Sequence, residues 1–135
     1  HHTVWISLSF TTRNYIMIDE FSWFVGLYEG EGTLYSPPSY NGVRMRMRIT
    51  DYDTALRAAR FLGVKPLKVS RTRKDGTKKD YILDHYKDMW EVTKSGGFKK
   101  GFLFNLCQKM YPHLSLHRRE QIDNTYKNAI EKLKS

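Results

Sequence analysis

The sequence predicts an α+β domain in the order α-ββ-α-ββ-αα, with an antiparallel sheet covered by helices on one face. Three observations support this: helix patterns at both ends, stretches of alternating apolar and polar residues between them, and turn-forming residues joining those stretches. Hairpins favour antiparallel pairing, because parallel strands need a long crossover connection. With 135 residues the chain is long enough for one domain with its own core.

Residues 1–18 are interpreted as an N-terminal extension and residues 19–135 as the single domain. Apolar residues alternate with others from Val4 to Phe10, which favours a strand. His1 and His2 are consistent with the remains of a purification tag and are not counted as metal ligands.

The first helix is expected over residues 20–30. Asp19 precedes it as the N-cap, and Gly30 and Gly32 mark its end. The turn-forming segment PPSYNG then separates two stretches with strand character. These strands are placed over 33–36 and 43–50.

The second helix is expected to begin at Thr50, with Asp53 three residues on as in a capping box, and to stop at Gly63. Its apolar stripe consists of Leu56, Ala59 and Leu62. A second hairpin follows around the strong turn signal Asp75-Gly76. Its strands are placed over 66–73 and 78–86.

Two helices complete the chain, separated by Pro112. The first is expected over 101–110 and the second over 116–133, each with apolar residues spaced for one face. The inward residues are Leu103, Leu106, Cys107 and Met110 in the first, and Ile122, Tyr126, Ala129, Ile130 and Leu133 in the second.

Positive charge is concentrated in the middle of the chain. The formal net charge is +9, and 12 of the 23 Lys and Arg residues lie in 43–79. In VRMRMRIT the arginines occupy every second position, so one face of that strand is apolar and the other carries Arg44, Arg46 and Arg48. Such a face is either simply solvated or binds a polyanion. Two-stranded ribbons fit the major groove of DNA, where arginine suits the acceptors of guanine.

The second hairpin would extend this surface with Arg71 and Arg73, or with Lys68, Ser70 and Thr72, depending on its register. We therefore predict a surface for double-stranded DNA. Its candidate residues are Arg44, Arg46, Arg48, Lys68, Ser70, Arg71, Thr72, Arg73, Lys78 and Lys79.

Two glycines and two glutamates stand out in the first helix. Gly26 and Gly30 share one helix face and would let another helix approach closely, within the monomer or across a dimer interface. Glu29 and Glu31 lie at the carbonyl end, where negative charge is disfavoured. A divalent cation between these acids and a DNA phosphate would remove the repulsion, whereas the plainer alternative is that both acids accept hydrogen bonds from the following turn.

Other classes of function are poorly supported. The lone Cys107 excludes an intrachain disulfide and fits a reducing compartment, so we expect an intracellular protein without a signal peptide or membrane span. The remaining histidines have no metal-site spacing, and no phosphate-binding glycine loop or nucleophile elbow is present.

Residues 24–32, FVGLYEGEG, resemble the LAGLIDADG motif of homing endonucleases. The resemblance extends over about 19–133, because the expected order of elements is also the family's. The stretches TDYD, DYIL and YPHLSLHRREQI are likewise similar to segments of its single-motif members. The matching motif residues are Gly26, Leu27, Glu29, Glu31 and Gly32.

The resemblance implies a homodimeric endonuclease that uses Mg²⁺ or Mn²⁺ to cut both strands of a long, nearly palindromic DNA site. It implies that Glu31 binds the metal with Gly30 beside it, that Glu29 supports the helix end, and that Asp51 helps to organise water. The motif helices would meet across the dimer. The implied interface residues are Phe24, Gly26, Leu27 and Gly30.

A basic residue, often lysine, commonly begins the last helix in this family. Here His117, Arg118 or Arg119 would have to serve, with His117 as the nearest positional match, and Lys94 is a further candidate. The leading alternative is a non-cleaving nucleic-acid-binding protein of the same fold, either an intron RNA-splicing cofactor or a DNA-binding regulator. A structural domain with a basic surface is the third hypothesis.

Overall fold

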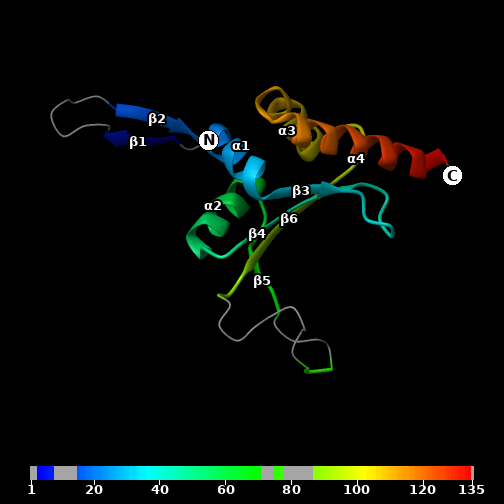
Figure 1. The fold of residues 1–135 in the computed structure, drawn as a ribbon, viewed down its shortest axis with the longest axis horizontal. Helices are drawn as coiled ribbons and strands as arrows, with labels where there is room; N and C mark the ends of the chain where they lie inside the picture. Colours follow the sequence, from blue (N-terminus) through cyan, green and yellow to red (C-terminus); the bar gives the residue numbers. More distant parts are fainter. Residues whose placement is uncertain (1–2, 8–14, 71–74, 78–86, 135) are drawn as a thin grey trace.

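The computed structural model describes residues 3–7, 15–70, 75–77 and 87–134. It confirms the α+β class, with helices on one face of a four-stranded antiparallel sheet (Figure 1). The elements are β1 (Thr3–Ser7), β2 (Tyr15–Asp19), α1 (Glu20–Glu31), β3 (Gly32–Tyr35), β4 (Val43–Ile49), α2 (Tyr52–Leu62), β5 (Leu67–Lys68), β6 (Trp90–Gly96), α3 (Phe102–Met110), the 3₁₀ turn η1 (Tyr111–His113) and α4 (Leu116–Lys134).

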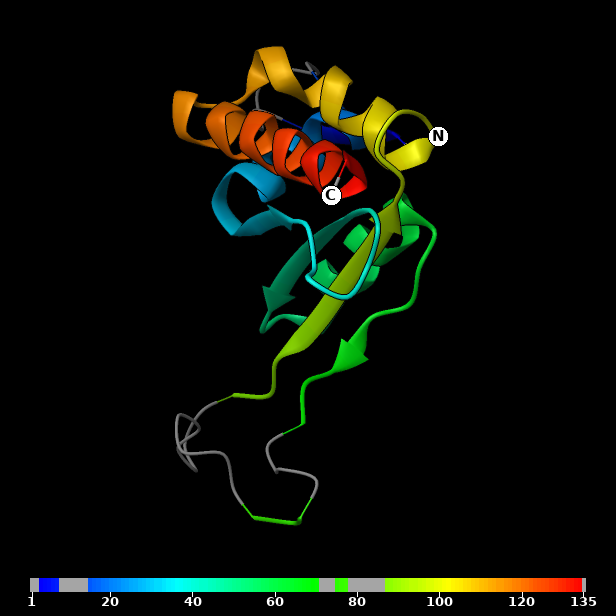
Figure 2. The ribbon, with the colours of Figure 1, turned by 90° about the vertical axis from the view of Figure 1, so that its right-hand side faces the viewer.

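The strand order is β3-β4-β6-β5, so β4 lies inside the sheet between β3 and β6. Met47 of β4 lies opposite Gly32 of β3 and Val92 of β6. The alternation predicted for β4 is confirmed, because its apolar residues are buried and its arginines are not. In Figure 2 the helices α3 and α4, drawn in yellow to red, lie above the sheet.

The second hairpin differs from the prediction. β5 has only two residues, and it pairs with β6, which the sequence analysis did not identify. In WEVTKSG, Val92 is buried, whereas the other residues are exposed or half-buried, so the apolar signal of a strand is weak. The predicted return strand over 78–86 lies outside the described residues.

The first two helices begin differently from one another. α1 follows Asp19 as expected, but Asp19 makes no capping hydrogen bond. The prediction of Thr50 as the N-cap of α2 is wrong: Asp51 is the N-cap, because its carboxylate accepts hydrogen bonds from the backbone and the hydroxyl of Thr54. Gly63 ends α2 as predicted, in the left-handed conformation with φ of 72°.

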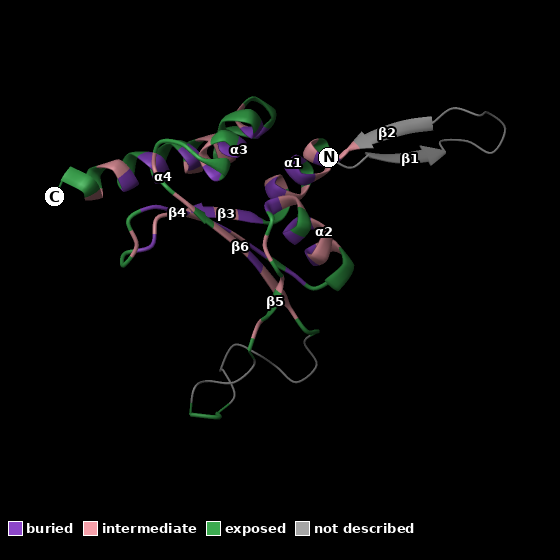
Figure 3. Cartoon of the chain, turned by 180° about the vertical axis from the view of Figure 1, so that it is seen from behind, coloured by how far each residue is buried: buried purple, intermediate pink, exposed green. Residues whose placement is uncertain are grey.

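The core lies where the helices face the sheet, as the buried residues in Figure 3 show. All four inward residues predicted for α3 are buried. In α4, Ile122, Tyr126 and Ala129 are buried as expected, but Leu133 is 52% exposed because it lies in the last turn. None of the helices in the described part of the chain is long and apolar enough to cross a bilayer.

At the N-terminus, β1 and β2 pair as a separate two-stranded antiparallel sheet. The strand expected from Val4 onward is thus present over residues 3–7, whereas β2 was not anticipated. Because β2 runs directly into α1, the extension is joined to the domain without a linker.

Candidate functional site

The arginines of β4 lie on the face of the sheet that points away from the helices. Arg44, Arg46 and Arg48 alternate with residues of the core, so their side chains share the opposite face. On the neighbouring strands the same face carries polar residues that pair with them. These are Thr33 and Tyr35 of β3, and Glu91, Thr93 and Ser95 of β6.

Neighbouring side chains orient these arginines. Arg44 Nε donates to Ser95 Oγ at 3.1 Å, and its guanidinium lies 5.5 Å from the centre of the Tyr40 ring. Arg46 lies over the Tyr35 ring at 5.3 Å. Ring contacts and single hydrogen bonds leave most of the five N–H donors of a guanidinium free for another partner.

One acid, Glu91, lies among the arginines. Glu91 Oε1 accepts from Arg48 Nε at 3.2 Å and lies 3.7 Å from Arg46 Nε. A single carboxylate cannot balance three guanidinium groups, so this face of the described sheet retains positive charge.

The register of β5 separates the predicted residues of the second hairpin. Lys68 lies opposite Trp90, on the other face from the arginines, and pairs with Asp88 at 3.2 Å. The alternative that placed Lys68 with the β4 arginines is therefore wrong. Ser70 lies beyond the end of β5. The candidates Arg71, Thr72, Arg73, Lys78 and Lys79 lie outside the described residues.

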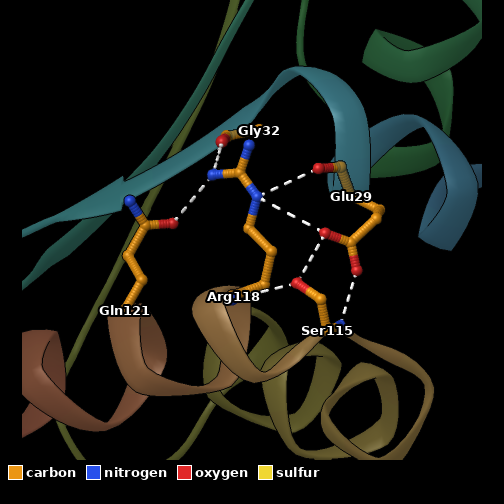
Figure 4. Close-up of polar contacts among 5 residues, drawn as sticks. All are labelled: Glu29, Gly32, Ser115, Arg118 and Gln121. Carbon is orange, nitrogen blue, oxygen red and sulfur yellow. Dashed lines mark hydrogen bonds and ion pairs between the residues drawn. The ribbon is translucent and has the colours of Figure 1, made fainter.

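The two glutamates at the end of α1 have different surroundings. The carboxylate of Glu29 accepts two hydrogen bonds from Ser115: Oε1 accepts from Ser115 N at 2.6 Å, and Oε2 accepts from Ser115 Oγ at 2.9 Å (Figure 4). Ser115 precedes α4, and its Oγ accepts from Arg118 N at 3.3 Å as an N-cap does. Glu29 thus lies at the positive end of α4.

These contacts change the acidity of Glu29. The pKa of its carboxyl group is lowered, chiefly by the hydrogen bond from the backbone of Ser115, while partial desolvation opposes the shift. Further lowering comes from the Ser115 hydroxyl and from the charges of Arg118 and His117. Glu29 does accept hydrogen bonds, but the alternative named the wrong donor: both bonds come from Ser115, which precedes α4, and not from the following turn.

Glu31, in contrast, is exposed and has no hydrogen-bond or ion-pair partner among the residues that the structure describes. It is the last residue of α1, and β3 begins directly after it. Because Gly32 lies opposite Met47, Glu31 is next to the strand pair that carries the arginines. Gly30, also exposed, belongs to the last turn, whose carbonyl groups have no partner within the helix.

The residues predicted as basic partners of Glu31 lie in different places. Arg118 donates from Nε to Glu29 O at 3.0 Å and from Nη1 to Gly32 O, so its guanidinium is engaged by the backbone of α1 and β3. His117 is exposed in the first turn of α4. Lys94 lies opposite Met45, on the helix side of the sheet, with Nζ 5.3 Å from the Phe102 ring.

Asp51 is exposed and serves as the N-cap of α2. Both hydrogen bonds from Thr54 reach Oδ2, at 3.0 Å from the backbone N and 2.6 Å from Oγ1. These bonds lower the pKa of the Asp51 carboxyl group, with the hydroxyl of Thr54 as the larger cause. The other oxygen, Oδ1, makes no hydrogen bond within the described part of the chain.

The glycine face of α1 is open. A Cβ built on Gly26 or Gly30 would meet no atom within 4 Å, so among the described residues no intramolecular contact requires glycine there. This argues against the alternative of a tight helix contact within the monomer. Leu27 is half-buried beside this face. Phe24, however, is fully buried in the core, so its prediction as an interface residue is wrong.

The described residues provide hard oxygen donors but no complete protein metal site. No group of three or more His, Cys, Asp or Glu side chains that could hold a metal occurs among the described residues. Magnesium typically takes only one or two protein carboxylates and keeps several waters. The Glu31 carboxylate, unpaired among the described residues, and the Gly30 carbonyl fit that requirement as candidate donors.

Sequence reasoning missed Ser115 and Glu91. Ser115 had a readable signal: in a capping box the N–H of the N-cap serine is bound by Glu or Gln three residues on, but that position holds Arg118. The N–H of Ser115 was therefore open to an acceptor from elsewhere in the chain. Glu91 had no such signal, because its strand was not recognised.

Comparisons with family models, curated proteins and solved structures found no match.

The single cysteine does not provide a nucleophile. Cys107 is buried, and burial raises the pKa of its thiol to about 12. A thiol is reactive as the thiolate, so Cys107 stays protonated at neutral pH.

Proposed function

We propose that this chain is a site-specific DNA endonuclease of the LAGLIDADG type, which acts as a homodimer with Mg²⁺ or Mn²⁺. The observation that carries the proposal is the contrast between the two glutamates. Glu29 is bonded to Ser115, whereas Glu31 is exposed, unpaired among the described residues and adjacent to the arginine strand. An unpaired acid at a helix C-terminus is unfavourable unless a cation binds it.

The positive face of the sheet suits a DNA duplex. Arg44, Arg46 and Arg48 project from one strand at alternate positions, in a row long enough to follow a groove. Residues of the second hairpin would extend the row beyond the described sheet. A duplex bound there would lie beside Glu31, at the point where β3 leaves α1.

The chemistry follows from this placement. A bound divalent cation would activate water and stabilise the leaving oxygen at the scissile phosphate. Glu31 and the Gly30 carbonyl would hold it, and the same groups of a second copy would address the other strand. His117, exposed at the start of α4, is the better candidate for the basic role, because Arg118 is engaged by backbone carbonyls.

The proposal is tested by cleavage of supercoiled DNA that carries candidate insertion sites, with Mg²⁺. Glu31→Gln should reduce cutting by about 100-fold or more, while binding measured in Ca²⁺ survives. Glu131→Gln, the same change at an exposed position of α4, is the matched control and should cut normally. A wild-type protein that binds one site tightly but never cuts it with either metal would instead support the non-cleaving alternative, with DNA or intron RNA as its partner.

A further inference from the structure

The backbone on both sides of Glu31 is held by a single side chain from a distant part of the sequence. Arg118 Nε donates to Glu29 O at 3.0 Å, and Arg118 Nη1 donates to Gly32 O at 2.5 Å (Figure 4). The two carbonyls belong to residues that flank Glu31 in the chain. The rigid guanidinium fork therefore spans the end of α1 and the start of β3.

Arg118 is itself fixed in position. Its side chain is 15% exposed, Nη1 also donates to Gln121 Oε1 at 3.1 Å, and its guanidinium lies 5.8 Å from the centre of the Tyr28 ring. Glu29 Oε2 lies 3.8 Å from Arg118 Nε and adds an ion pair. With four protein partners, Arg118 is poorly placed to contact DNA or to move a proton.

The chain after Glu31 is also held by packing. A Cβ at Gly32 would lie 2.2 Å from the Tyr28 ring, so the backbone rests directly on that ring. Glu31 thus lies between the carbonyls of Glu29 and Gly32, both bound by Arg118, while its own carboxylate stays free.

We infer that Arg118 is a positioning residue that sets the location of the Glu31 carboxylate by clamping the backbone around it. This inference rests on the proposed function. A metal site tolerates little displacement of its ligands, and outer partners that orient ligands typically contribute about 10- to 100-fold to metal affinity or activity. The role differs from the catalytic one that the sequence indicated for Arg118.

The test compares Arg118→Ala and Arg118→Lys with Lys127→Ala, which removes one exposed positive charge from the same helix. Arg118→Ala should lower the single-turnover cleavage rate by about 10- to 100-fold, and raise the Mg²⁺ concentration for half-maximal rate. Site affinity in Ca²⁺ should be unchanged. For Arg118→Lys, the cleavage rate and the Mg²⁺ requirement should fall between those of the wild type and Arg118→Ala, because an ammonium lacks the guanidinium fork. Lys127→Ala should match the wild type in both.

Amide hydrogen exchange gives an independent readout of the clamp. In Arg118→Ala the amides of residues 30–33 should exchange faster than in the wild type, and those of α2 should not change. If Arg118→Ala fails to fold, Arg118→Lys carries the same comparison. A rate and Mg²⁺ dependence equal to the wild type would overturn the inference, as would a loss confined to DNA affinity. A wild-type protein that never cuts would overturn the proposed function as well.

Discussion

At the scale of the residue, two carboxylates separated by one glycine have different surroundings. Glu29 reaches the start of α4, where a backbone N–H and a hydroxyl of Ser115 bind it. Glu31, at the last position of the helix, has no such partner among the described residues. The local sequence could predict that both acids occupy an unfavourable position at the end of a helix. Only the position of α4 determines that Glu29 is bound and Glu31 is not.

Asp51 offers a prediction at the same scale. Asp51→Asn keeps an oxygen that can accept from Thr54, whereas Asp51→Ala removes the cap of α2. At pH 7 we expect Asp51→Ala to lower the melting temperature by a few degrees, and Asp51→Asn to lower it less. The measurement is thermal unfolding followed by circular dichroism.

The pH dependence of this difference follows from the lowered pKa of Asp51. A carboxyl group whose pKa is depressed by folding stabilises the protein above its unfolded value of about 3.9. That stabilisation is lost as the pH falls through the lower, folded value. The gap in stability between the wild type and Asp51→Asn should therefore shrink as the pH falls below about 4; a gap that widens in acid would contradict the assignment of the cap.

At the scale of the element, α1 and α4 satisfy each other's ends. The first helix supplies Glu29 to the N-terminus of α4, and α4 supplies Arg118 to carbonyls at the C-terminus of α1. Each charge lies near the end of the partner's dipole that favours it. The exchange joins segments 86 to 89 residues apart in sequence.

The open glycine face of α1 yields a prediction at this scale. A Cβ at position 26 meets no atom within 4 Å, and Gly26→Leu replaces the worst helix former after proline, so monomer stability should rise by about 0.5–1 kcal/mol. The same side chain would block close approach of a second helix. We therefore expect sedimentation at micromolar concentration to show a dimer for the wild type and a monomer for Gly26→Leu.

The matched control is Asn124→Leu, which adds the same side chain to an exposed position of α4. It should leave the association state unchanged. A wild-type protein that is strictly monomeric on and off DNA would contradict the proposed homodimer. A Gly26→Leu variant that still dimerises would show that the interface lies outside the glycine face of α1.

At the scale of the whole molecule, charge and fold combine to give the described sheet a positive face. The net charge of +9 does not by itself define a surface, and part of the basic segment is used internally, since Arg57 pairs with the buried Glu20. What remains on the open side of the sheet is ordered by the strand period. Glu91 offsets part of the charge near Arg48, so Arg44 is the least compensated of the three.

DNA binding should therefore depend steeply on salt. Each phosphate neutralised contributes about −0.9 to the slope of log affinity against log salt. We expect Arg44→Gln to make the slope shallower by about 0.9, and Lys109→Gln, an equal charge change on the exposed side of α3, to leave it unchanged. Fluorescence anisotropy with a labelled duplex over a range of KCl concentrations measures both; a flat dependence in the wild type would remove the argument for DNA.

Prediction from sequence succeeded where the signal is local and strong. The alternation in β4, the inward residues of α3 and the glycine stop of α2 follow from period and turn chemistry, and all are observed. It failed for β6. Only the first two residues of this strand pair with β5, and the outer face of the strand is open, so its residues are mostly polar and carry little strand signal. It also failed for Phe24, because helix position alone does not say which face the core covers.

The sequence by itself determined the fold class, the strand that carries the arginines and the helix that carries both acids, because periodicity depends only on neighbours along the chain. Tertiary structure decided which acid is bound and which is free, which face of α1 stays open, and that Arg118 holds the backbone around Glu31. The contacts of Glu29 and Arg118 depend on hydrogen bonds between residues more than 80 positions apart, and the open face of α1 depends on how the helix packs, neither of which a local pattern encodes.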